Sequence, residues 1–409
     1  MTGKWNYLPL TQEEQKIETA LAQRYASCPP VSQLLVQRGV TSVEEADRFF
    51  NPRLKNLHDP YLMPDMDKAV ERLNRAMGAK EKIMVYGDYD VDGTTAVALV
   101  YKYLSNFYSN IDYFIPTRYE EGYGISSEII DDFAGQGVKL VIILDCGIKA
   151  NEEIAHAREH GIDFIICDHH VPDEELPHAV AILNPKMPGS TYPCPHLSGC
   201  GVGFKFMQAF AQSNGIAQGE LEGMLDLVAV SIAADIVPMV DENRIMAYYG
   251  LRRLNTNPNM GLRAIIRICN LTNREITISD VIFKIGPRIN ASGRMQSGKA
   301  AVDLLVSRDI ADAYERAKDI DQYNRDRKEL DKRITEEANA ILSKRHEAES
   351  DKKTIVIFNK DWHKGIIGIV ASRLTELYYK PAVVLTLVNG LATGSSRSVQ
   401  GFDIYSAID

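Results

Sequence analysis

The sequence contains no apolar run long enough to span a bilayer, and residues 1–5 lack the pattern of a signal peptide. We therefore expect a cytoplasmic protein that does not act at a membrane. Internal repeats and low-complexity segments are absent, and no Walker A sequence indicates work driven by a nucleoside triphosphate. The 45% hydrophobic and 25% charged residues are typical of a globular protein.

The sequence also has no excess of basic over acidic residues. The chain has 46 Lys and Arg against 55 Asp and Glu, which gives a net charge of −9. This balance argues against broad, nonspecific binding to polyanions. It leaves nucleic acid open as a partner, because many acids can be metal ligands. Contacts with nucleic acid would then come from a local basic groove.

Cysteine is scarce, with 6 residues in 409. Cys146 and Cys167 end apolar runs, which suits small buried thiols better than disulfides. Cys194, His196 and Cys200 lie close together, but no second ligand pair follows them, so the spacing argues against a structural zinc site.

Three apolar runs each end in acidic or imidazole side chains. Residues 83–87, 139–144 and 163–167 are predicted to be short buried strands. In a parallel sheet the carboxyl ends of the strands meet at one ligand-binding edge, so the side chains that follow should converge. Carboxylates this close repel one another unless cations neutralise them, which predicts a divalent metal site, for two ions. These side chains are Asp88, Asp90, Asp92, Asp145, Asp168, His169 and His170.

The residue types indicate the chemistry of that site. Asp88, Asp90 and Asp92 can wrap a cation if Gly93 opens a strand-to-helix turn; alternatively, one Asp caps the turn and two are solvated. Asp oxygens combined with an imidazole suit Mn²⁺, and Mg²⁺ less well. Two such ions brace the attacking and leaving oxygens of a phosphoryl displacement, so phosphate-ester hydrolysis is the predicted reaction class.

Two glycine-containing segments outside this cluster carry arginine. Residues 286–295 are predicted to form a loop in which Arg288 and Arg294 grip phosphodiester oxygens. In residues 394–397, Ser395 and Arg397 can contact a phosphate. Each segment is equally consistent with an ordinary glycine turn.

The alternation of strands and helices from Lys82 predicts an α/β fold with a parallel sheet flanked by helices. A chain of this length needs more than one core. We expect an N-terminal helical segment at 1–55, a catalytic domain at 56–300, a linker helix at 301–350 and a second α/β domain at 351–409. The second domain shows only two strands and one helix, so we expect it to be partial. The charged linker helix is interpreted as solvated, or alternatively as lining a nucleic-acid groove.

Taken in order, these motifs resemble the DHH phosphoesterase family and, within it, the bacterial exonucleases specific for single strands. The resemblance covers most of the chain. The matching segments are 86–93, 144–147, the name-giving Asp168-His169-His170, 198–205, 234–238, 286–294 and 362–368.

The resemblance implies 5′-to-3′ degradation of single-stranded DNA with two Mn²⁺ or Mg²⁺ ions, in recombination and repair. It implies a second domain of the DHHA1 type, and single-strand-binding protein and a RecQ-type helicase as partners. Two alternatives stay open. One is a DHH enzyme that cleaves short oligoribonucleotides or cyclic dinucleotides, and the other is a non-catalytic replication scaffold of the same fold.

The resemblance also implies roles for single residues. His170 would contact the scissile phosphate, with Asp88 as an additional member of the catalytic set. Ser395 and Arg397 would hold the 5′ end, and Arg118, Tyr123 and Arg294 would contact DNA. The implied metal ligands are Asp90, Asp92, Asp145, His169 and Asp235.

The sequence departs from the family pattern at two places. Tyr86 stands where many relatives carry His, which weakens a metal-binding role at that position. The family pattern also continues beyond Asp409 with a Gly-Gly-His segment and an OB-fold. An OB-fold supplies a stacking platform for single strands, so we expect weaker DNA binding by this chain alone.

Overall fold

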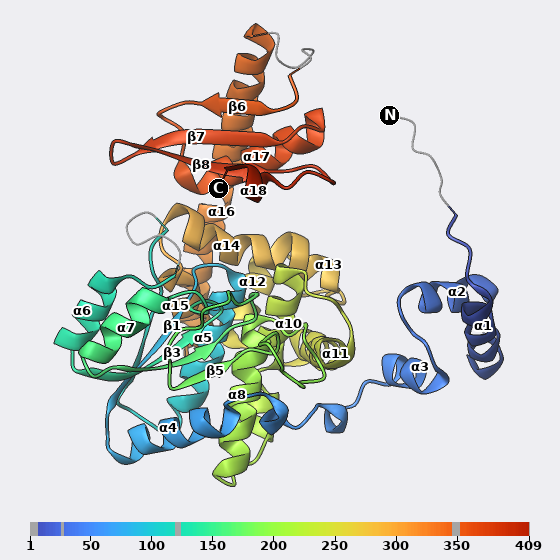
Figure 1. Cartoon of the computed structure of the whole chain (residues 1–409), viewed down its shortest axis with the longest axis vertical. Helices are drawn as coiled ribbons and strands as arrows, with labels where there is room; N and C mark the ends of the chain where they lie inside the picture. The colour runs from blue at the N-terminus through green and yellow to red at the C-terminus, as the bar shows by residue number, and fades with distance from the viewer. Residues whose placement is uncertain (1–6, 26–27, 119–123, 346–351, 409) are drawn as a thin grey trace.

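The computed structural model describes residues 7–25, 28–118, 124–345 and 352–408. Figure 1 shows a large lower unit around one sheet, a smaller upper unit around a second sheet, and the first helices standing to one side. No helix in the described ranges is long and apolar enough to cross a membrane.

The sheet of the lower unit has five parallel strands in the order β2-β1-β3-β4-β5, which confirms the predicted fold class. Its side chains alternate between two separate cores. Val85 and Ile142 face one core, whereas Tyr86 and Ile143 face the other. A parallel sheet covered on both faces explains why the sequence of its strands is almost continuously apolar. The strands are β1 (Lys82–Gly87), β2 (Ile111–Phe114), β3 (Val138–Leu144), β4 (Asp163–Cys167) and β5 (Ala181–Leu183).

Helices cover both faces of this sheet (Figure 1). Two of them, α6 (Ser127–Gly135) and α7 (Asn151–Glu159), pack over the smaller core. The larger core lies beneath most of the others. These are α4 (Met66–Gly78), α5 (Val91–Leu104), α8 (Gly199–Ser213), α9 (Gly219–Glu222), α10 (Leu225–Asp235), α11 (Asp241–Thr256), α12 (Met260–Ile268), α13 (Ile278–Asp280), the π-helix η3 (Val281–Ile285), α14 (Gly286–Met295) and α15 (Lys299–Val306).

The N-terminal segment is helical, as expected, and has a small core of its own around Leu21, Leu35 and Ala46. Ser42 caps α3 by accepting a hydrogen bond from the Glu45 amide at 3.1 Å. The elements are α1 (Gln12–Tyr25), α2 (Pro29–Gln37), α3 (Val43–Phe50), η1 (Leu54–Asn56) and η2 (Pro60–Leu62).

The expected single helix after residue 300 is two helices, because the chain turns at Ser307 before Asp309 caps α16 (Ile310–Lys344). Ala317 and Ile320 of α16 pack in the large core, and Ile334 and Leu342 pack in the core of the upper unit. The helix therefore links the two units and is packed at both ends, and one of its faces is buried, whereas charged residues such as Lys328 and Arg333 are exposed.

The upper unit contains one more strand than expected. β6 (Ile355–Phe358) pairs in parallel with β7 (Ala382–Val388), which pairs in the antiparallel sense with β8 (Leu391–Arg397). Ser395 and Arg397 therefore lie on a strand and not in a glycine turn. Two helices, α17 (Lys364–Tyr378) and α18 (Ile404–Ile408), complete the unit.

The predicted phosphate loop at 286–295 is also wrong, because these residues form α14. The helix continues directly from η3, and Pro287 lies in its first turn, where a missing amide hydrogen costs little. Gly293 is required by packing: a Cβ there would lie 2.4 Å from the Tyr89 carbonyl oxygen. Glycine at this position thus lets α14 approach the backbone between Asp88 and Asp90.

We predict that Gly293→Ala lowers the free energy of unfolding by about 1–3 kcal/mol, the usual cost of overpacking. The measurement is the melting temperature. Gly135→Ala is the matched control, because Gly135 also lies in a helix and a Cβ there meets nothing within 4 Å. Equal melting temperatures of the two variants would contradict the prediction.

Candidate metal centre

The acidic and imidazole residues that follow the strands lie together at the carboxyl edge of the first sheet. Asp88 and Asp90 lie between β1 and α5, Asp145 follows β3, and His169 follows β4. Asp235 comes from elsewhere in the sequence, as the last residue of α10. The ligand atoms form three groups, each within 4.8 Å: Asp88 with Asp90 and Asp145, Asp92 with His169 and Asp235, and Asp145 with His169 and His170.

His169 lies at the middle of this constellation. Its Nε2 is 3.1 Å from Asp145 Oδ1, 3.7 Å from Asp92 Oδ2 and 3.7 Å from Asp235 Oδ2. Asp92, Asp145 and His169 are buried, and Asp235 is partly exposed. The structure therefore brings one imidazole within reach of three carboxylates.

Several buried atoms here have no hydrogen-bond partner. They are Asp88 Oδ1, Asp145 Oδ1 and both ring nitrogens of His169. Buried polar atoms are normally satisfied, so such a group needs an explanation. Divalent cations with oxygen and imidazole ligands would satisfy the two carboxylate oxygens and one ring nitrogen of His169, and the residues present fit such ions.

The pKa values of the carboxylates indicate the same crowding. Burial and then the charge of Asp90 raise the pKa of Asp88 to about 7. Burial and then the charge of Asp92 raise the pKa of Asp235 to about 7. Burial followed by Asp92 and Asp90 raises the pKa of Asp145 well above its usual range. Without a cation these groups are pushed toward their protonated forms.

The three aspartates after β1 have different surroundings. Asp90 caps α5, because its Oδ1 accepts a hydrogen bond from the Gly93 amide at 3.0 Å. Asp88 and Asp92 are buried and not solvated, so the alternative of a simple capped turn is wrong.

Asp92 is held by the start of α8. Its carboxylate accepts hydrogen bonds from the amides of Gly199 (2.7 Å) and Cys200 (2.8 Å) and from the Ser231 hydroxyl (2.7 Å). A Cβ on Gly199 would lie 2.7 Å from Asp145 Oδ1. The glycine-rich segment at 198–203 thus positions two carboxylates. The residue pattern alone does not reveal this role, because Asp92 is more than a hundred residues away.

Asp168 serves a different purpose from the other acids. Its Oδ1 lies 2.7 Å from His170 Nδ1 and accepts the amides of His169 and His170, and its Oδ2 accepts the Ile148 amide. The hydrogen bond to Asp168 raises the pKa of His170. Asp168 therefore orients His170, whose side chain is 46% exposed.

The backbone is unusual at Asp145 and directly after Asp235. Asp145 has φ 61°, and Ile236, directly after Asp235, has φ 58°. Left-handed conformations are uncommon for residues other than glycine, and for a β-branched residue they are strained. In both cases the turn lies at the acidic cluster.

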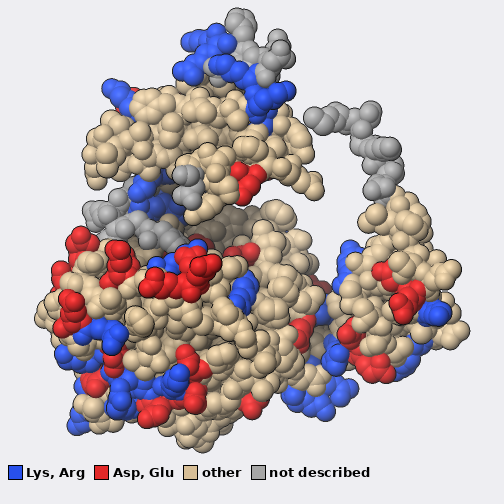
Figure 2. All heavy atoms as spheres, in the orientation of Figure 1, with Lys and Arg blue, Asp and Glu red and all other residues tan. Residues whose placement is uncertain are grey.

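Arg118 and Arg294, two basic residues predicted to contact substrate, make different contacts. The Arg118 guanidinium lies 4.1 Å from the centre of the Tyr89 ring, and its Nε is buried without a hydrogen-bond partner. Arg294 donates to the Gly365 carbonyl at 3.2 Å. Burial, then Arg118 and Arg327, lower the pKa of Arg294 to about 10. We call Arg118, Arg294 and Arg327 the basic cluster, and Figure 2 shows basic side chains in the recess between the two units.

Four other predicted residues, Arg288, Ser395, Arg397 and Tyr123, lie elsewhere. Arg288 forms an ion pair with Asp321 of α16, and its Nε lies 2.9 Å from Asp321 Oδ1. Arg397 donates to the hydroxyls of Ser372 and Ser395 on the upper unit. Tyr123 lies outside the described residues. Tyr86 donates its hydroxyl to the Gly124 carbonyl in the smaller core, consistent with its departure from the family pattern.

Comparisons with known proteins agree with this geometry. The model of the DHH family, N-terminal domain, matches residues 82–232. The single-stranded-DNA-specific exonuclease RecJ of Bacillus subtilis is 38% identical over 97% of this chain, which spans 49% of that relative. RecJ of Escherichia coli is 34% identical over 94% of this chain, and the chain covers 68% of that relative.

Solved structures give the same result. RecJ from Thermus thermophilus in complex with Mn²⁺ matches 98% of the chain with a TM-score of 0.81 and 26% identity, and the chain covers 56% of it. An exonuclease RecJ bound to manganese matches 87% with a TM-score of 0.75 and 28% identity, and the chain covers 86% of it. The chain spans about half the length of the Bacillus and Thermus relatives.

We predict that Asp145→Asn raises the melting temperature by a few degrees in the absence of divalent metal, because it removes a buried carboxyl group that is costly in the cluster whether it is charged or protonated. With Mn²⁺ the order should reverse, since the variant loses an anionic oxygen for the cation. The measurement is thermal unfolding with and without Mn²⁺. Asp319→Asn, on the exposed surface of α16, is the control and should shift neither value. A variant that gains as much from Mn²⁺ as the native chain would contradict the prediction.

Proposed function

Because this chain belongs to the RecJ group of the DHH family, we propose that it hydrolyses single-stranded DNA from the 5′ end with two Mn²⁺ or Mg²⁺ ions. The proposal depends on the convergence of Asp92, Asp145 and Asp235 around His169, where buried ligand atoms are left unsatisfied. Asp88 and Asp90 lie within reach of Asp145 in the same cluster. When bound, the ions would supply a nucleophilic hydroxide and offset charge on the attacking and leaving oxygens.

His170 is the residue we assign to the scissile phosphate. Asp168 holds its ring through Nδ1, so that the other nitrogen is directed away from Asp168. An imidazole held in this way donates to a phosphate oxygen as negative charge develops there. The pairing with Asp168 raises the pKa of His170 and so favours the protonated, donating form.

The basic cluster supports a polyanionic substrate. Arg118 and Arg294 lie beside the loop that carries Asp88 and Asp90, because Arg118 stacks on Tyr89. The same region is tied to the upper unit: Lys364 Nζ donates to the Arg118 carbonyl at 2.9 Å, and Arg294 donates to Gly365. We infer that the strand passes between the two units, with Arg118 and Arg294 on its phosphates.

The upper unit supplies the residues that we expect to set the direction in which the strand is degraded. Ser395 and Arg397 share a strand, and their side chains interact at 3.3 Å. A hydroxyl beside a guanidinium suits a terminal 5′ phosphate. We therefore propose that this pair holds the 5′ end while the first phosphodiester lies at the acidic cluster. Cooperation with single-strand-binding protein and a RecQ-type helicase in recombination and repair belongs to the same proposal.

We predict that the chain with Mn²⁺ releases mononucleotides from the 5′ end of single-stranded DNA. Strands labelled at the 5′ end should lose their label at once, whereas 3′-labelled strands should shorten gradually. The duplex of the same sequence is the control and should resist. Early loss of the 3′ label, or turnover of dinucleotides only, would overturn the polarity or the choice of substrate.

We predict that His170→Gln lowers the single-turnover rate by about 100-fold or more, the usual contribution of a positioned proton donor. Mn²⁺ affinity should change little, because the Asp and His169 ligands stay in place. His178→Gln, at an exposed histidine outside the cluster, is the matched control. Unchanged turnover in the His170 variant would remove this residue from the mechanism.

A further inference from the structure

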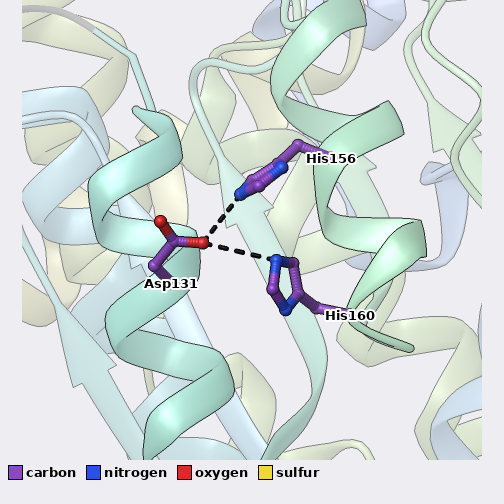
Figure 3. Close-up of side chains that lie close together, drawn as sticks. All are labelled: Asp131, His156 and His160. Atoms are coloured by element: carbon purple, nitrogen blue, oxygen red, sulfur yellow. Dashed lines mark hydrogen bonds and ion pairs between the residues drawn. The ribbon is translucent and has the colours of Figure 1, made fainter.

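A second group of side chains that could hold a metal ion shares no residue with the acidic cluster (Figure 3). Asp131 belongs to α6, His156 to α7, and His160 follows directly after α7. Asp131 Oδ1 is 2.7 Å from His156 Nε2 and 3.4 Å from His160 Nε2. Each residue offers a ligand atom, and the three atoms lie within 4.8 Å of one another.

The packing of α6 and α7 in one core fixes the positions from which these side chains project. His156 and His160 are four residues apart, so they project from one face of a helical turn. Their ring centres are 4.7 Å apart. Ile130 and Phe133 of α6 and Ile154 and Ala157 of α7 pack in the same buried core, which fixes the distance between the helices. The ligand atoms therefore converge without a rearrangement of the backbone.

The charge around the group favours a cation. In α6 and α7 six acidic residues accompany one arginine, Arg158. Figure 2 shows acidic side chains over this side of the lower unit. The acidic residues are Glu128, Asp131, Asp132, Glu152, Glu153 and Glu159.

We propose that Asp131, His156 and His160 form a zinc site that is separate from the catalytic centre. Two imidazole nitrogens and one carboxylate oxygen are a common three-ligand set for Zn²⁺, with a fourth position left for water. Tetrahedral ligands at about 2.0–2.1 Å from zinc are roughly 3.3 Å apart. The 3.4 Å between Asp131 and His160 matches that separation. Asp131 and His156 are closer, at 2.7 Å, because they form a direct hydrogen bond, which the ion would replace.

The two sites differ in their donors, and hence in the metals that they select. The catalytic centre is rich in carboxylate oxygens, which suits Mn²⁺ and Mg²⁺. The surface site has mainly imidazole nitrogens, which favour Zn²⁺ over those ions. A bound zinc would join α6 to α7, and its role would be to stabilise this face of the sheet. This inference does not depend on the proposed nuclease activity.

The test is the zinc content of the chain after equilibrium dialysis against Zn²⁺. The variant His156→Ala/His160→Ala should bind one zinc fewer per chain than the native protein. Zinc that enters the catalytic centre is present in both samples and cancels. His178→Ala should retain the native content. Equal zinc in the double variant and the native chain would overturn the proposal.

Asp131→Asn gives a second readout that survives poor folding of the double variant. The amide keeps an oxygen next to His156 but loses the charge, so the affinity for Zn²⁺ at this site should fall at least tenfold. Zinc should also raise the melting temperature of the native chain more than that of this variant. Equal affinities and equal thermal shifts would overturn the site. Nuclease turnover with Mn²⁺ should be the same in all these variants, which separates this test from that of the proposed function.

Discussion

The repulsion between carboxylates at the carboxyl edge of the first sheet is the constraint on which the rest of this structure depends. Burial and mutual charge raise the pKa values of Asp88, Asp145 and Asp235. Such a cluster is costly in a folded chain unless cations hold it. Hydrogen bonds from the surrounding structure stabilise and orient some of these acids. Amides at the start of α8 and the Ser231 hydroxyl hold Asp92.

The packing explains how a charged centre can be kept rigid. The strands are buried on both faces, so the polar residues at their ends are attached to a rigid sheet. The long helix α16 is packed in the cores of both units. The upper unit is therefore attached by a continuous helix as well as by the contacts of Arg294 and Lys364.

Donor chemistry separates the functions of otherwise similar residues. His169 has three carboxylates around one ring nitrogen, whereas Asp131 has two imidazoles around one oxygen. His170 has a carboxylate on Nδ1 that orients it. We propose that the same two residue types thus provide a centre for hard cations, a site for zinc and a phosphate contact, according to their number and burial.

The sequence by itself determined the parallel sheet and the polar ends of β1, β3 and β4, because a strand buried on both faces needs an apolar run and the topology places the ends together. It also predicted the helical N-terminal segment and helical structure after residue 300, since helical composition and caps are local. Only the tertiary structure decided that 286–295 is a helix and that Ser395 lies on a strand, because Gly293 and Gly394 are there for close packing, which a local pattern does not distinguish from a turn. Only the fold brings Asp235, Gly199 and Ser231 to the acids, and Asp131 to His156, because these contacts join residues that are distant along the chain and meet only when the helices pack.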